Sequence, residues 1–128
     1  MVDRPWTAVA AAADDREYLA LISYLPLKRF RTVPRFLRYS GAIAEQLERT
    51  RGLVGFAFRG KIIAREFYTL SVWDDEQALM DFVRAEPHLG TMGALRPHMA
   101  ETKFVRWRVK GPRVPPSWED ALRALRSE

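Results

Sequence analysis

The feature that most limits the fold of this chain is the order of its strand-like and helix-like segments. Compact runs rich in apolar and β-branched residues predict four strands, at 18–24, 53–59, 66–73 and 103–109. Apolar residues recur at three- and four-residue steps at 33–47 and again at 75–83, which predicts a helix in each place. The sequence therefore predicts the order strand, helix, strand, strand, helix, strand.

Capping and turn residues predict where the helices begin and end. Thr32 is a candidate N-cap for the first helix, and Gly52 is expected to end it. Asp74 is a candidate N-cap for the second helix, which Pro87 interrupts. Two further short helices are expected, at 88–96 and after Ser117.

This order of elements defines an α+β fold class. Right-handed crossovers arrange it as a ferredoxin-like β-α-β-β-α-β antiparallel sheet with the helices on one face. In the last predicted strand, Val105, Trp107 and Val109 alternate with arginines, but apolar residues occur on both faces of several other strands. Because the helices leave one face open, we expect a second copy of the chain to cover it in a homodimer.

The 128 residues fit one domain with two flanking segments. We predict an N-terminal arm at 1–17, in which the alanine-rich stretch 7–13 forms a short helix or a loose arm. The ferredoxin-like domain is expected at 18–111. Residues 112–128 are expected to form a proline-rich linker and a short helix that packs on the domain.

Composition excludes several classes of site. The chain has no cysteine, which excludes disulfides, thiolate metal sites and a cysteine nucleophile. No apolar run approaches the roughly 20 residues that span a bilayer, and no secretory signal is evident, so we expect a cytoplasmic protein with no membrane span. The net charge of +5 fits either a solvated basic surface or an anionic partner.

Several motifs in these segments match those of a known superfamily. They lie at 52–56 (GLVGF), 67–73 (FYTLSVW), 75–83, His88 and 104–107 (FVRW). Together they resemble the dimeric α/β-barrel superfamily, which includes the antibiotic-biosynthesis monooxygenases, haem-degrading monooxygenases and a spheroidene-monooxygenase-like group. The resemblance covers about residues 18–111 and implies a ferredoxin-like fold that closes into a dimeric α/β barrel.

The same resemblance implies a site between the sheet and its helices. Trp73, which closes the third strand, and His88, which follows the second helix, match two positions that contribute to this site. The haem-degrading relatives add an asparagine on the first strand, and this chain has no asparagine. The cofactor therefore stays open between two alternatives: haem bound through His88, or no cofactor at all.

We predict one pocket that is walled by Trp73, Phe82 and Met92, with His88 as its main polar group. His88 and Trp73 are the candidate catalytic residues, since His88 could remove a proton from a phenolic or quinol substrate. His88 could equally cap a helix after Pro87, and Trp73 could be an ordinary core residue. The remaining candidates for ligand binding are strand tyrosines whose hydroxyls could bind a substrate oxygen: Tyr24 and Tyr68.

These observations favour a monooxygenase-like oxidoreductase that acts on an apolar, flat or polyunsaturated small molecule. The first alternative is a non-catalytic dimeric binding protein for a hydrophobic ligand. The second is an RNA-binding module, because the same strand order builds such modules and 55–58 (GFAF) resembles their aromatic signature. That signature belongs on the third strand rather than the second, so a nucleic-acid partner is not favoured. No pair of histidines has metal-ligand spacing, and we expect no metal held by protein ligands alone.

Overall fold

The computed structural model describes residues 2–127 and contains one five-stranded antiparallel sheet. The strands are β1 (Val2–Ala8), β2 (Glu17–Pro26), β3 (Leu53–Lys61), β4 (Glu66–Trp73) and β5 (Lys103–Lys110). Their order across the sheet is β1-β3-β4-β2-β5. The four strands predicted from the sequence are β2 to β5, and their arrangement confirms the predicted ferredoxin-like α+β fold.

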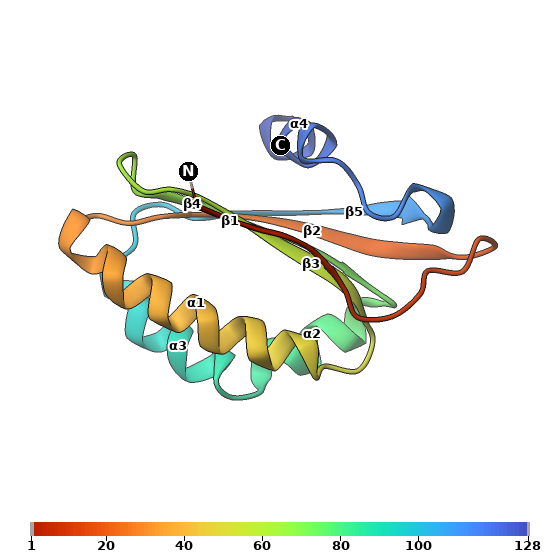
Figure 1. The fold of residues 1–128 in the computed structure, drawn as a ribbon, viewed down its shortest axis with the longest axis horizontal. Helices are drawn as coiled ribbons and strands as arrows, with labels where there is room; N and C mark the ends of the chain where they lie inside the picture. Colours follow the sequence, from red (N-terminus) through yellow and green to blue (C-terminus); the bar gives the residue numbers. More distant parts are fainter. Residues whose placement is uncertain (1, 128) are drawn as a thin grey trace.

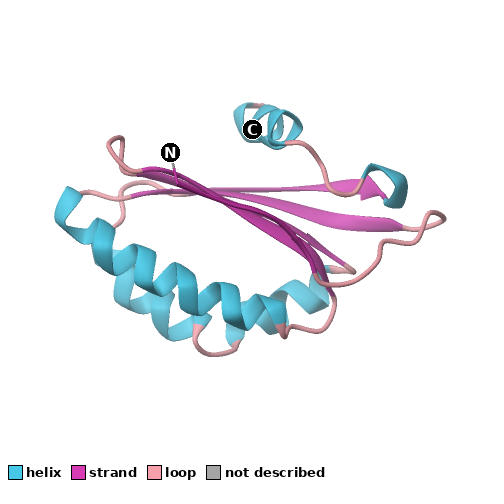
Figure 2. Ribbon diagram, viewed as in Figure 1, coloured by secondary structure: helices cyan, strands magenta, loops and turns pink. Residues whose placement is uncertain are grey.

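The helices lie on both sides of this sheet (Figures 1 and 2). On one side are α1 (Val33–Glu48), α2 (Glu76–Arg84) and α3 (His88–Leu95). On the other side is α4 (Trp118–Arg126), which contacts β2 and β5. No helix in the part of the chain from residue 2 to residue 127 has the length and apolar character that crossing a membrane requires.

The caps of the helices agree with the sequence in part. Ser117 caps α4 as predicted, because its hydroxyl accepts a hydrogen bond from the backbone N–H of Asp120 at 3.0 Å. For α2 the prediction was wrong by one residue, since Asp75 rather than Asp74 is the N-cap. Thr32 precedes α1 but makes no side-chain cap hydrogen bond, because a 3₁₀ turn leads directly into the helix.

The first part of the N-terminal arm, Val2–Ala8, is a strand. β1 pairs with β3 in antiparallel register, with Arg4 opposite Phe58 and Thr7 opposite Phe56. The prediction of a short helix or loose arm beginning at Thr7 was therefore wrong for the first two of its residues, and no helix follows them. The strand can contain Pro5 because β1 lies at the edge of the sheet.

The sheet face that carries α4 was expected to be open, and the chain itself covers much of it. Ala121 and Leu125 of α4 form a buried cluster with Ile22, Leu70 and Val105. Three partly buried tryptophans pack around this cluster: Trp6, Trp107 and Trp118. None of the large apolar side chains that remain exposed belongs to it. Contact with a second copy is therefore not needed to shield this face from water.

Candidate functional site

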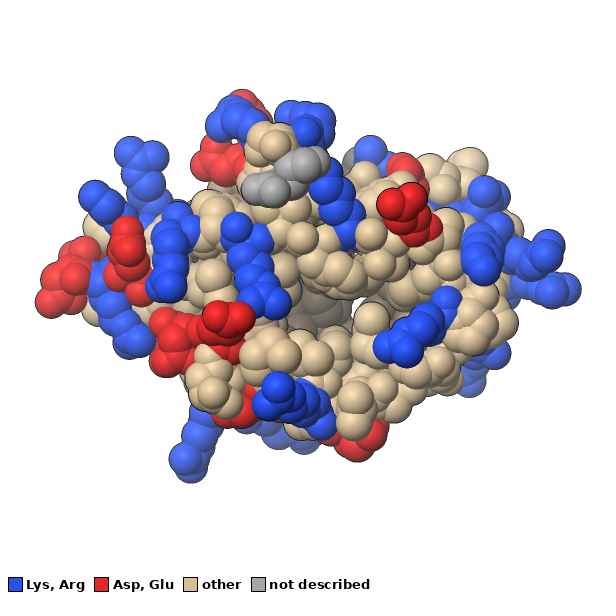
Figure 3. All heavy atoms as spheres, turned by 180° about the vertical axis from the view of Figure 1, so that it is seen from behind, with Lys and Arg blue, Asp and Glu red and all other residues tan. Residues whose placement is uncertain are grey.

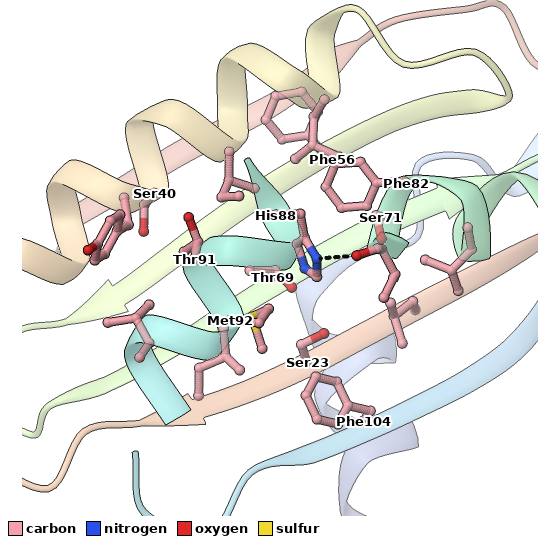
Figure 4. Close-up of a pocket in the computed structure, with 18 of the residues that line it drawn as sticks. Ser23, Ser40, Phe56, Thr69, Ser71, Phe82, His88, Thr91, Met92 and Phe104 are labelled. Carbon is pink, nitrogen blue, oxygen red and sulfur yellow. Dashed lines mark hydrogen bonds between the residues drawn. The ribbon is translucent and has the colours of Figure 1, made fainter. Parts of the chain in front are cut away.

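A cavity of about 590 Å³ lies between the sheet and the helices α1, α2 and α3. Its walls are mainly apolar side chains, and a few hydroxyl groups and one histidine interrupt them (Figure 4). Among the described residues that line the cavity, only His88 has a side chain whose usual pKa is close to 7. An apolar chamber with few polar groups is typical of a small-molecule site.

His88 begins α3 and is held by contacts on three sides. Its backbone N–H donates a hydrogen bond to Gln46 Oε1 at 3.0 Å, which ties α3 to α1. Its ring nitrogen Nδ1 lies 3.2 Å from the carbonyl oxygen of Val83 in α2. The ring also packs against Phe82 with centroids 4.8 Å apart. In Figure 4 the imidazole lies within the cavity between the helices and the sheet.

These contacts determine the protonation state of His88. A carbonyl oxygen only accepts hydrogen bonds, so Nδ1 must carry the proton, and in the neutral ring Nε2 then holds a free lone pair. Burial lowers the pKa of His88 from its ordinary value, and the hydrogen bond to Val83 opposes that effect only in part. His88 is therefore a neutral imidazole at pH 7, able to accept a proton at Nε2.

Trp73 closes β4 and lines the same cavity as His88. Its side chain is 1% exposed, and its indole N–H donates a hydrogen bond to Ser71 Oγ at 2.8 Å. The Trp73 and Phe82 rings are tilted, with centroids 5.3 Å apart, so Phe82 contacts both Trp73 and His88. The structure brings Trp73, Phe82, His88 and Met92 together around one cavity, as the sequence predicts. Their chemical roles remain predictions.

The two candidate tyrosines lie on the opposite face of the sheet, in the cluster beneath α4. The Tyr24 hydroxyl donates a hydrogen bond to Glu66 Oε2 at 2.6 Å, and this bond, with burial, raises the pKa of Tyr24 to about 12. The Tyr68 ring lies 5.4 Å from that of Tyr24, and burial raises its pKa as well. The structure thus places both tyrosines away from the cavity, so the prediction that they bind the same ligand as His88 and Trp73 does not fit their position.

A patch of hydroxyl groups on the cavity floor was missed from the sequence. Ser23 of β2 lies directly opposite Thr69 of β4, and Ser71 is the next residue along β4 on the same face. Phe104 and Phe58 extend this cross-strand row on either side. All five side chains line the cavity, so hydroxyl groups occupy the middle of its floor between two aromatic rings. Figure 4 shows four members of this row: Ser23, Thr69, Ser71 and Phe104.

Ser71 is the hydroxyl whose orientation is best defined. Because Ser71 Oγ already accepts the Trp73 indole hydrogen, its own hydrogen is directed elsewhere. The sequence did contain a signal for this patch. Small hydroxyl residues occupy alternate positions, Thr69 and Ser71, in an otherwise apolar strand whose inward face should be apolar.

The mouth of the cavity opens beside the edge strand β5. Two apolar side chains that line it, Phe104 and Leu89, are 52% and 53% exposed. Arg106 of β5 reaches across to Glu76 of α2, with 2.6 Å between its Nη1 and Glu76 Oε1, while Arg96 lines the cavity at the end of α3. Figure 3 shows the hollow from this side, with basic side chains around it.

The aromatic residues that suggested RNA binding do not form a platform for bases. Phe56 is completely buried, and both Phe56 and Phe58 line the cavity beneath the helices. RNA-recognition modules stack bases on aromatic rings at an open sheet face. These two phenylalanines therefore belong to the cavity wall rather than to a nucleic-acid surface.

Comparison with known proteins identifies the fold but no close relative. No family model matches the sequence, and no curated protein matches it either. A crystal structure of an antibiotic biosynthesis monooxygenase superimposes with a TM-score of 0.64 at 14% identity, over 70% of this chain and 95% of that one. The chain has the fold of the antibiotic biosynthesis monooxygenases.

Two further solved structures superimpose on this chain over most of both chains. A conserved protein from Methanosarcina mazei Go1 has a TM-score of 0.67 at 15% identity, over 76% of this chain and 97% of that one. SnoaB, a cofactor-independent oxygenase from Streptomyces nogalater, has a TM-score of 0.61 at 15% identity, over 79% and 99%. The chain also spans 45% and 51% of two longer proteins, from Fusobacterium nucleatum and Lactobacillus acidophilus. At such identities the likeness establishes the fold alone.

Proposed function

We propose that this protein is a monooxygenase-like oxidoreductase that acts on an apolar, flat or polyunsaturated small molecule in the cavity between the sheet and α1 to α3. The observation that carries the proposal is the state of His88. It presents a neutral imidazole inside an apolar chamber, with Nδ1 bonded to a backbone carbonyl and Nε2 able to accept a proton. The shared fold with SnoaB, described as a cofactor-independent oxygenase, supports the same chemistry.

The proposed reaction begins with proton removal from carbon. Nε2 of His88 takes a proton from a CH₂ group that a neighbouring phenol or ketone makes acidic, which leaves a delocalised carbanion. The carbanion reduces dioxygen and forms a carbon–oxygen bond, and the resulting peroxide takes the proton back from His88. Loss of water then gives a carbonyl. One CH₂ group and one O₂ are converted to one C=O group and one water.

The cavity walls supply binding and charge stabilisation for this reaction. The rings of Trp73, Phe82 and Phe58 offer aromatic faces to a flat or polyunsaturated molecule. The hydroxyls of Ser71 and Thr69, which line the same cavity, would donate hydrogen bonds to a substrate oxygen that gains negative charge as the proton leaves. Removing water from the chamber strengthens these interactions.

The haem-dependent alternative also has a basis in the geometry of His88. A histidine that donates its Nδ1 hydrogen to a backbone carbonyl has a contact typical of metal-binding histidines, so His88 would be the residue that holds haem iron, through Nε2. Arg96 and Arg106 at the mouth would be the cations available to carboxylates of the cofactor. Bound haem would supply oxygen activation. Titration of the purified protein with haem, followed by visible absorption, tests this alternative.

The test of the leading proposal is oxygen uptake with anthrone, a flat compound whose CH₂ group is acidified by a ketone. We expect uptake by the wild-type protein and a fall of roughly a hundredfold or more in His88→Gln. The matched control is His98→Gln, the same replacement at the other histidine, which does not line the cavity. Equal uptake by both variants would show that His88 is not the base.

A binding protein without activity is the second candidate, and the same samples distinguish it. Among the described residues that line the chamber, only His88 has a side chain whose usual pKa is near 7. No second acid or base of this kind supports His88, and this observation favours a protein that only binds its ligand. Saturable anthrone binding in fluorescence titrations, without oxygen uptake by the wild-type protein, would establish binding alone.

We also propose that the protein forms a homodimer, as its resemblance to the dimeric α/β-barrel superfamily implies. Since α4 already packs on the sheet face expected to pair, a dimer through that face requires α4 to move aside or to pack on the partner. One chain has a mass of 14.8 kDa, and light scattering is expected to give twice that mass. A mass of one chain at micromolar concentration would contradict the dimer.

A further inference from the structure

Two glycines within helices have no packing reason to be glycine. Gly41 lies in α1 and Gly93 in α3, where glycine destabilises a helix relative to alanine. A Cβ atom added at either position would meet nothing within 4 Å. Both residues instead border empty space, since Gly93 lines the main cavity and Gly41 lines a second hollow of about 490 Å³.

The second hollow lies between α1 and the β1 edge of the sheet. Arg4 and Pro5 of β1 line it together with Leu37 and Gly41 of α1. Four residues line both this hollow and the main cavity: Phe36, Ser40, Phe58 and Thr69. The two hollows therefore adjoin, and in Figure 3 a narrow gap in the depression shows the background behind the molecule.

The two hollows open at opposite edges of the sheet. The main cavity opens beside Phe104 on β5, and the second hollow beside Arg4 on β1, and these are the two edge strands. Five strands are separated by four spacings of about 4.8 Å, so the sheet above the two hollows is about 19 Å wide. A compact ring system would occupy the main cavity alone.

We infer that the passage formed by the two hollows binds an elongated apolar molecule, an extended polyene or acyl chain, which reaches from the main cavity through the second hollow to the β1 edge. The inference rests on the proposed function and narrows its substrate class from flat or polyunsaturated molecules to elongated ones. Gly93 lines the main cavity and Gly41 the second hollow, and no atom lies within 4 Å of the position that a Cβ atom would take at either residue.

The experiment compares a long and a compact fluorescent probe. Parinaric acid, a polyunsaturated fatty acid, is the long probe, and naphthol is the compact one, both titrated at physiological salt. Gly41→Leu is expected to weaken binding of parinaric acid about tenfold or more and to leave that of naphthol within about twofold. Gly41→Ala is the matched control, because its methyl group leaves the hollow open. Gly93→Leu, at the other end, is expected to weaken parinaric acid as well.

Two results would overturn the inference: no binding of parinaric acid to the wild-type protein, or unchanged affinity in Gly41→Leu. Thermal unfolding of each variant shows that it is folded, and leucine favours a helix more than glycine does. Anthrone oxidation by the wild-type protein tests the proposed function separately. If anthrone is oxidised while parinaric acid does not bind, the proposed function stands and the elongated substrate does not.

Discussion

Replacing Gly55 by alanine tests how the edge strand β1 is attached to the sheet. The Trp6 side chain lies directly over Gly55, so a Cβ atom there would be 2.3 Å and 2.6 Å from two atoms of the indole ring. It would also lie 2.9 Å from the backbone carbonyl oxygen of Thr7. Because carbon atoms do not pack this closely, either the indole or β1 itself must move.

The expected cost follows from two opposing effects. Overfilling a well-packed site costs about 1–3 kcal/mol. Replacing glycine by alanine reduces the freedom of the unfolded chain and returns about 0.4–1 kcal/mol where the backbone allows it. The net expectation for Gly55→Ala is a loss of about 1–2 kcal/mol in the free energy of unfolding.

Urea unfolding of four proteins measures this effect: the wild type, Gly55→Ala, Trp6→Ala and the double variant. Without the Trp6 indole, the contact of 2.9 Å with the backbone carbonyl of Thr7 remains, so the cost of Gly55→Ala should fall but not disappear. If Gly55→Ala costs the same in both backgrounds, the indole is not what excludes a side chain there.

Three further variants have defined outcomes. Burial holds the pKa of His88 below about 6.5, its value in the unfolded chain, so the unfolded state binds more protons than the folded state. The free energy of unfolding therefore falls as the pH decreases through that value. In urea unfolding between about pH 7.5 and 5.5, His88→Gln should lose less stability than the wild type. Gly41→Ala should raise the free energy of unfolding by about 0.5–1 kcal/mol, and a decrease would mean that the space beside it is filled. Ser71→Ala should lower it by about 1–3 kcal/mol by leaving the buried Trp73 indole N–H without its acceptor, and a neutral effect would show that the indole finds another.

The core strands could be predicted from the sequence because each is continuous and apolar, and β4 has the predicted bounds. β1 was missed for a physical reason. It contains Pro5 and is followed by an alanine-rich stretch, and its only strand partner is β3, about 50 residues further along the chain. Local sequence does not encode such a pairing, and edge strands accept residues that local rules exclude.

The candidate site was predictable in part. Trp73 and His88 could be placed by resemblance, and the fold brings them to one cavity because α3 packs against α1 and α2 after Pro87. Tyr24 and Tyr68 were grouped with them because the sequence does not tell which face of a mostly apolar strand the helices cover. The register of β2 against β4 resolves this, since both tyrosines lie on the face opposite to Ser23.

The distribution of the tryptophans gives the protein two separate optical reporters. Three of its four indoles pack around α4 on one side of the sheet, and Trp73 alone lies in the cavity wall on the other. In a Trp73→Phe variant the remaining emission reports the contact between α4 and the sheet. The difference between the wild-type and variant spectra is then the signal of the cavity. Ligand entry and detachment of α4 can therefore be followed independently in one sample series, without an attached dye.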